Sequence, residues 1–214
     1  MATTPNKLAT LRLLLAERFP TTARSHGRTL LTGIPSLDHA TGGLPLGAIT
    51  EMIATAPSCG SMLVLGQLLL ATRATRTRLA LIDASDSFDP ASFNEDLLSH
   101  LVWVRCTGQA AALQAADLLI RDANLGLVVL DLRRIPARDL RATPAQHWYR
   151  LQRAVEPSDL ALVITTPCAT VPSAQVRFEL NTPHPLDALD GERAKLTTAL
   201  APTPQRQRRH TAAS

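Results

Sequence analysis

The residues best placed to do chemistry lie at positions 54–63, ATAPSCGSML, where a strand pattern gives way to a helix pattern. Such a loop binds a nucleotide when glycine amides surround the phosphates, a lysine neutralises them and a Ser or Thr hydroxyl ligates Mg²⁺. Gly60 keeps the second glycine of this pattern, but Thr55 replaces the first. Ser61 stands at the lysine position and Met62 at the hydroxyl position. The spacing indicates a phosphate loop that has lost its charged groups, so ATP binding and a bound cofactor are not expected.

Two more places could supply groups for hydrolysis, which needs a base for the attacking water and a carboxylate near the metal. Ser85 and Asp86 follow the apolar run 79–83, and Asp131 follows the run 126–130. A hydroxyl with no base beside it cannot take the proton, and a shift of one residue to Asp86 turns the side chain in another direction. Asp131 is either a magnesium-holding carboxylate or an ordinary strand-end aspartate that caps the next turn.

Apolar runs alternate with helix patterns along the middle of the chain. Runs such as LALID, LVVLD and LALVIT are apolar throughout, which is typical of parallel strands with both faces buried under helices. We expect strands at 48–53, 79–83, 101–105, 126–130 and 160–165, helices at 63–74, 90–100, 110–124 and 144–155, and a half-exposed edge strand at 175–181. The pattern predicts an α/β fold, a doubly wound and mostly parallel sheet with helices on both faces.

The length of 214 residues favours one core domain, which we place at residues 29–201. A helix and linker are expected within residues 1–28, and residues 202–214 read as a disordered basic tail. The helix pattern at 7–19 gathers leucines on one side, so this helix could pack on its own domain or bind a neighbour. These leucines are Leu8, Leu11, Leu14 and Leu15.

The net charge is +4, and several arginines follow the run that ends at Asp131: Arg133, Arg134, Arg138 and Arg141. They could contact the phosphates of single-stranded DNA, form a protein-binding patch or simply face solvent. His147, Trp148 and Tyr149 lie together in an expected helix, where Trp148 is better explained as core or partner surface than as a base-stacking platform.

The cysteines and histidines exclude some classes of protein. The three cysteines have no metal-ligand or disulfide spacing, and the six histidines are dispersed, so no metal site is expected. No apolar run approaches the roughly 18 residues that span a bilayer. A protein of the reducing cytoplasm fits this composition best.

Residues Thr32–Met52, TGIPSLDHATGGLPLGAITEM, resemble the segment that leads into the P-loop of RecA-family recombinases. LALIDASDSFDP is similar to the family stretch in which a glutamate activates water, and Ser85 occupies that position. LGLVVLDL is similar to the Walker B strand, which implies a magnesium-holding role for Asp131. LALVITTP is similar to the strand that carries a phosphate-sensing glutamine, here Thr165 or Thr166. Three of four nucleotide-handling positions have therefore changed type, so the resemblance implies a RecA-like fold without ATPase activity.

Among RecA relatives, a short chain with a degraded P-loop looks like ImuA, the RecA-like accessory of bacterial mutagenesis cassettes, and also resembles SulA-type division inhibitors. The resemblance implies a non-catalytic adaptor in the SOS response to DNA damage and in translesion synthesis. The implied partners are RecA, an inactive Y-family polymerase homologue and an error-prone DNA polymerase, with single-stranded DNA as a weaker contact and no membrane. Two alternatives stay open: a divergent DNA-dependent ATPase that uses Asp86 and Asp131, and a SulA-type inhibitor of the cell-division GTPase.

Overall fold

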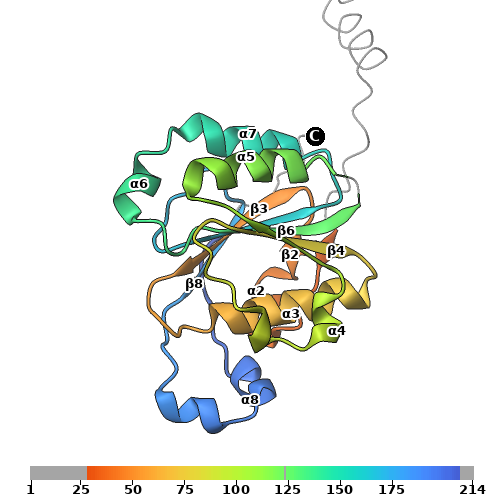
Figure 1. Cartoon of the computed structure of the whole chain (residues 1–214), viewed down its shortest axis with the longest axis vertical. Helices are drawn as coiled ribbons and strands as arrows, with labels where there is room; N and C mark the ends of the chain where they lie inside the picture. The colour runs from red at the N-terminus through yellow and green to blue at the C-terminus, as the bar shows by residue number, and fades with distance from the viewer. Residues whose placement is uncertain (1–27, 123, 208–214) are drawn as a thin grey trace, which may run out of the picture.

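Seven strands form the central sheet of the computed structural model, which describes residues 28–122 and 124–207 (Figure 1). Their order across the sheet is β5-β4-β6-β7-β3-β8-β9, and only the pairing of β8 with β9 is antiparallel. The strands are β3 (Ala48–Ala54), β4 (Arg78–Asp83), β5 (Leu101–Arg105), β6 (Leu125–Asp131), β7 (Ala161–Thr166), β8 (Val176–Leu180) and β9 (Thr203–Gln207).

Helices cover both faces of this sheet, α3 and α4 on one side and α5 and α7 on the other (Figure 1). Their bounds are α3 (Ser61–Ala74), α4 (Glu95–Leu98), α5 (Gln109–Leu119) and α7 (Ala145–Val155). Each face has its own buried apolar cluster, one that includes Leu65 and Leu68 of α3 and one that includes Ala116 of α5 and Leu151 of α7. Strands β3, β4, β6 and β7 are almost wholly buried, as their unbroken apolar runs require. The predicted doubly wound α/β fold is confirmed.

Short elements complete the chain. They are β1 (Thr29–Leu30), α2 (Pro35–Thr41), β2 (Leu44–Pro45), the 3-10 turn η1 (Pro90–Ser92), α6 (Ala137–Arg141), the 3-10 turn η2 (Leu186–Asp190) and α8 (Arg193–Thr198). Strands β1 and β2 form a small antiparallel pair just before β3. The side chain of Asp38 in α2 accepts hydrogen bonds from the backbone N–H of Thr32 and Gly33, which fixes the start of the domain.

The helix predicted at 90–100 is wrong. The segment instead contains η1 and the four-residue helix α4, with an extended residue, Phe93, between them. Asp89 accepts from the N–H of Ala91, and Asn94 accepts from the N–H of Asp96. Two side-chain caps five residues apart start two short helical turns in place of one long helix, because Asp and Asn favour the N-cap over the helix interior.

The predictions for the last part of the chain also need correction. Residues 175–181 were expected to form an edge strand, but β8 has β3 on one side and β9 on the other. Residues 203–207, assigned to a disordered tail, form β9. Hydrogen bonding to an otherwise open strand edge compensates for the low apolar content of TPQRQ, which the sequence pattern alone cannot show. The rest of the predicted tail, 208–214, lies outside the described residues.

The leucine-rich segment at 7–19 lies outside the described residues as well, and with it Leu8, Leu11, Leu14 and Leu15. Within the described ranges, no helix is both long enough and apolar enough to cross a membrane. Across the same residues, His, Cys, Asp and Glu side chains nowhere gather in a group of three or more that could hold a metal ion.

Candidate nucleotide site at the carboxyl edge of the sheet

The phosphate-loop segment joins β3 to α3 and keeps the backbone shape of such a loop. Gly60 has a φ of 88°, a left-handed conformation that favours glycine, and it directly precedes the first residue of α3, Ser61. The backbone N–H of Thr55 donates to the carbonyl of Leu180 on β8. The loop therefore lies at the carboxyl ends of the parallel strands, where open α/β sheets place their ligands.

Arg133 occupies the centre of this edge. Its Nε lies 2.9 and 3.0 Å from the two carboxylate oxygens of Asp131, and its Nη2 lies 2.6 Å from Oδ2. Its Nη1 donates to the Oγ of Ser61 at 2.5 Å. The guanidinium thus bridges the strand-end carboxylate of β6 and the first residue of α3, across 72 residues of chain.

The charge of Arg133 is permanent in this setting. The two side chains are only 18% and 7% exposed, so solvent screens their attraction weakly. Burial lowers the pKa of the Arg133 guanidinium, but the hydrogen bonds and negative charge of Asp131 outweigh it, and the pKa is raised overall. A side-chain cation therefore neutralises the carboxylate that would otherwise be available to a metal ion.

Little space is left around this ion pair. The cavity enclosed beside it has a volume of about 10 Å³, which is at the lower limit for a single water molecule. It is lined by residues of the sheet and of α3, namely Met52, Ser61, Met62, Leu65, Leu68, Leu81, Val129, Asp131, Arg133 and Thr165. A phosphate group does not fit into it.

Residues 182–201, called the cap segment below, cover the outside of the loop. A Cβ on Gly60 would come within 2.5 Å of Leu200 Cδ2 and 3.2 Å of His184 Nε2. The N–H of His184 donates to the carbonyl of Ser58 at 2.9 Å. Leu200 and Cys59 are 4% and 3% exposed. The loop is therefore packed against the chain's own side chains at Cys59 and Gly60.

Helix α8 anchors the cap segment near the start of α3 (Figure 1). Arg193 donates to the carbonyl of Met62 at 3.3 Å and to that of Ser92 at 3.0 Å. Its guanidinium carbon lies 4.8 Å from the ring centroid of Phe93, a cation–π contact. No sequence motif pointed to this segment, because its apolar residues are few and follow no single period.

Ser85 and Asp86 lie in the turn after β4, which the buried carboxylate of Asp83 organises. Asp83 accepts from the N–H groups of Ser85, Ser87 and Phe88 at 3.2, 2.8 and 2.8 Å. Asp86 has a φ of 50° and forms a two-point ion pair with Arg105 on the neighbouring strand β5. The hydrogen bond from Arg105 lowers the pKa of Asp86. Both carboxylates required by the ATPase alternative are therefore already bound to arginines.

Thr165 and Thr166 have different surroundings at the end of β7. Thr165 is opposite Asp131 in the sheet and lines the small cavity. Thr166 donates from its hydroxyl to the carboxylate of Glu51 at 3.0 Å.

Glu51 is a buried carboxylate to which the sequence pattern assigned no role. Its carboxylate is fully buried on β3 and accepts from the N–H groups of Thr170 and Val171 at 2.7 and 3.1 Å. Arg177 of β8 completes the site with an ion pair of 2.6 Å. A carboxylate inside an apolar strand needs such partners, and that placement is the signal that could have revealed it. Glu51 fixes the loop after β7 and does not face the phosphate loop.

The four predicted DNA- or partner-binding arginines do not form one group. Arg134, Arg138 and Arg141 are exposed, and Arg138 lies 3.3 Å from the neighbouring Asp139. Arg133 was expected at the surface, where it could contact DNA or a partner, but its guanidinium is held inside the site by Asp131. Arg138 and Arg141 lie in the short helix α6. Trp148 is 1% exposed and belongs to the core, which is one of the two locations predicted for it.

The structure has a mostly parallel α/β core, consistent with a RecA-like fold, in which Cys59 and Gly60 of the phosphate-loop segment pack against the chain's own side chains. In agreement, the chain is similar to the protein RecA of Saccharopolyspora erythraea, with 34% identity over 147 residues. The match covers 61% of this chain and 42% of that RecA, so the chain spans less than half the length of this relative. No family model matches the sequence. The comparison supports a distant RecA-like relationship.

Proposed function

We propose that this protein is a non-catalytic adaptor with a RecA-like fold that acts in the cytoplasm during the SOS response to DNA damage. The observation that carries the proposal is the guanidinium of Arg133, which bridges Ser61 and Asp131 where a nucleotide site would need a free carboxylate. This guanidinium occupies the carboxylate and the hydroxyl that a metal-bound phosphate would need, which supports a non-catalytic role.

The proposed partners follow from the ImuA-like resemblance: RecA, and a complex of an inactive Y-family polymerase homologue with an error-prone DNA polymerase. Contact with single-stranded DNA is proposed as a weaker addition through Arg134, Arg138 and Arg141, which are exposed. Three arginines give a modest and salt-sensitive affinity, because each phosphate contact releases counterions.

Two measurements on the full chain test the proposal. Calorimetric titration with ATP and Mg²⁺ is expected to give no heat of binding. Pull-down with RecA assembled on single-stranded DNA is expected to retain the protein, and removal of residues 1–28 is expected to abolish that retention. DNA-stimulated ATP turnover that disappears in Asp131→Ala would instead establish the ATPase alternative.

A negative pull-down with RecA does not end the test. The same assay with the polymerase complex distinguishes an adaptor that binds only polymerases from one that binds neither. Failure to bind both, together with binding to the cell-division GTPase, would replace the adaptor proposal with the SulA-type alternative.

A further inference from the structure

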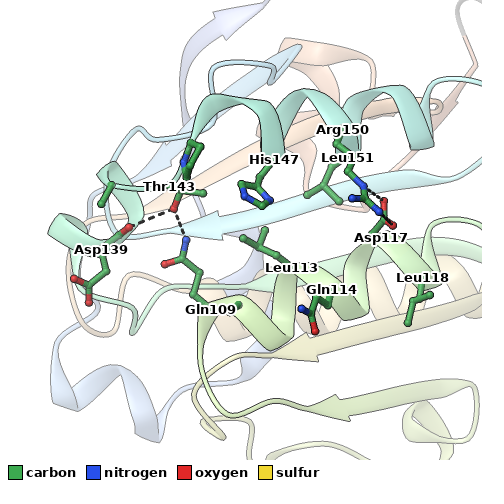
Figure 2. Close-up of a pocket in the computed structure, with 13 residues that line it drawn as sticks. Gln109, Leu113, Gln114, Asp117, Leu118, Asp139, Thr143, His147, Arg150 and Leu151 are labelled. Atoms are coloured by element: carbon green, nitrogen blue, oxygen red, sulfur yellow. Dashed lines mark hydrogen bonds and ion pairs between the residues drawn. The ribbon is translucent and has the colours of Figure 1, made fainter.

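A groove lies between α5 and α7, on the face of the sheet away from α3 (Figure 2). Its cavity volume is about 770 Å³, far more than the space at the phosphate loop. Leu113, Leu118 and Leu151 give it apolar walls, and Leu118 is 72% exposed. Leu118 adds to the apolar lining of the groove, and grooves with apolar walls are surfaces on which proteins bind amphipathic helices.

Polar bridges hold the groove open at its two ends (Figure 2). At one end, the side-chain amide of Gln109 donates to the hydroxyl of Thr143. At the other, Arg150 forms a two-point ion pair with Asp117 at 3.0 and 2.6 Å. Gln109 and Asp117 are eight residues apart on α5, so the hollow between these bridges is about 12 Å long. That length suits about two turns of a helix.

The chain before the described region leaves the domain beside this groove. Arg28, the first described residue, lies 3.0 Å from the carboxylate of Asp159, four residues after the end of α7. The carbonyl of Arg28 accepts from the N–H of Leu46. The preceding residues therefore start beyond the carboxyl-terminal end of α7, and the exposed Leu118 lies next to the last residue of α5.

Length and pattern of that preceding chain match the groove. The segment 7–19 has a helix pattern with leucines at positions 8, 11 and 15, and the seven-residue step from Leu8 to Leu15 spans about 10 Å of helix, within the length of the hollow. The eight residues 20–27 can extend over about 27 Å, which exceeds the length of the groove. A tether of this length gives the segment a local concentration near the millimolar range, which favours binding within one chain over binding between chains.

We propose that residues 7–19 bind in the α5–α7 groove of their own chain as an amphipathic helix, with their leucines against Leu113, Leu118 and Leu151. This inference goes beyond the adaptor function and needs neither nucleotide nor RecA. It also gives the segment two states, bound in its own groove or released to another protein.

Hydrogen exchange of the full chain, followed by mass spectrometry, tests the proposal. Residues 7–19 are expected to exchange at least about tenfold more slowly than in a free peptide of residues 1–27, because docking protects their amides. Leu118→Glu places a charge in the groove and is expected to remove this protection. Leu70→Glu is the matched control, because Leu70 is also an exposed helix leucine, at 45%, but lies on α3 at the other face of the sheet.

Two further measurements distinguish the possible outcomes, a folding control and a dilution series. Slow exchange of β6 amides in both variants shows that the domain remains folded. Protection that persists through a hundredfold dilution supports binding within one chain, whereas protection lost on dilution shows a second copy as the occupant and overturns the proposal. Exchange of residues 7–19 at the free-peptide rate, or protection unchanged by Leu118→Glu, also overturns it.

Discussion

The carboxyl edge of the sheet is packed against other parts of the chain, whereas the α5–α7 groove is open. At the edge, Arg133 is paired with Asp131, the cap segment packs on Gly60, and the cavity beside the ion pair is about 10 Å³. Between α5 and α7, a groove of about 770 Å³ lies beside an exposed leucine. The edge is therefore closely packed, whereas the groove presents an open surface with apolar walls.

The largest expected effect concerns the ion pair at the closed edge. Arg133→Met leaves the buried Asp131 without its cation, so the free energy of unfolding is expected to fall by about 3–5 kcal/mol. Urea denaturation at neutral pH measures it. Arg134→Met, at the exposed neighbouring position, serves as the control and should change stability little. Equal stability of the two variants would mean that Arg133 does not hold the edge closed.

The cap segment can be tested through Gly60. Gly60→Ala is expected to cost about 1–2 kcal/mol for its left-handed conformation, and about 1 kcal/mol more for the contact with Leu200. Gly42→Ala is the control, because Gly42 has a φ of 73° but nothing within 4 Å of an added Cβ. The contact contribution is expected to disappear when Leu200→Ala is combined with Gly60→Ala. If Gly60→Ala and Gly42→Ala cost the same, the cap segment does not pack on the loop.

The polar bridge at the groove gives a smaller and pH-dependent effect. Hydrogen bonds from Arg150 lower the pKa of Asp117, and Arg121 adds to the shift. Since the folded-state pKa lies below the unfolded one, the stabilisation is present at neutral pH and is lost as pH falls through the folded-state value. Asp117→Asn is therefore expected to lower the unfolding free energy by about 1 kcal/mol at pH 7.

The measurement for Asp117 is a urea midpoint for wild type and variant at several pH values. The difference between them should vanish in strong acid, where Asp117 is protonated in both states. Asp139→Asn is the matched control, because Asp139 also lines the groove but is 51% exposed and pairs only weakly. A difference that persists in acid would show that Asp117 acts through packing alone.

The smallest expected effect is on DNA. Arg134→Gln with Arg141→Gln is expected to reduce the slope of the salt dependence of single-stranded DNA binding by about 1.4, since each of the two phosphate contacts contributes about 0.7. Fluorescence anisotropy across a salt series measures it. Arg76→Gln with Arg78→Gln removes the same charge from exposed positions at the start of β4 and should leave the slope unchanged. Equal slopes for the two double variants would show that the arginines after β6 have no special contact with phosphate.

The central strands and their layers could be predicted from sequence, because fully apolar runs such as LVVLD have few other structures open to them. The position of the phosphate loop also followed, from Gly60 and the strand before it. That position 85 holds a serine and not a glutamate is a matter of residue type, which is read directly from the sequence.

The remaining features depend on contacts between distant parts of the chain. Arg133 follows a strand-end aspartate and looks like a surface residue, yet its side chain turns back to Ser61. The cap segment depends on Leu200 reaching Gly60 across 140 residues of sequence. Strand β9 has almost no apolar side chains, and its structure comes from pairing with β8. Periodicity reports local burial, so it cannot show any of these.

The four interactions of Glu51 have a mechanical consequence for the loop after β7. One carboxylate joins β3, the turn at Thr170 and β8, so the turn cannot shift without breaking two hydrogen bonds from its backbone N–H groups to a buried carboxylate. A loop restrained in this way is poorly suited to transmit a conformational change, since that requires two arrangements of similar free energy. When a partner binds elsewhere on this protein, we therefore expect no conformational change to be transmitted through the end of β7.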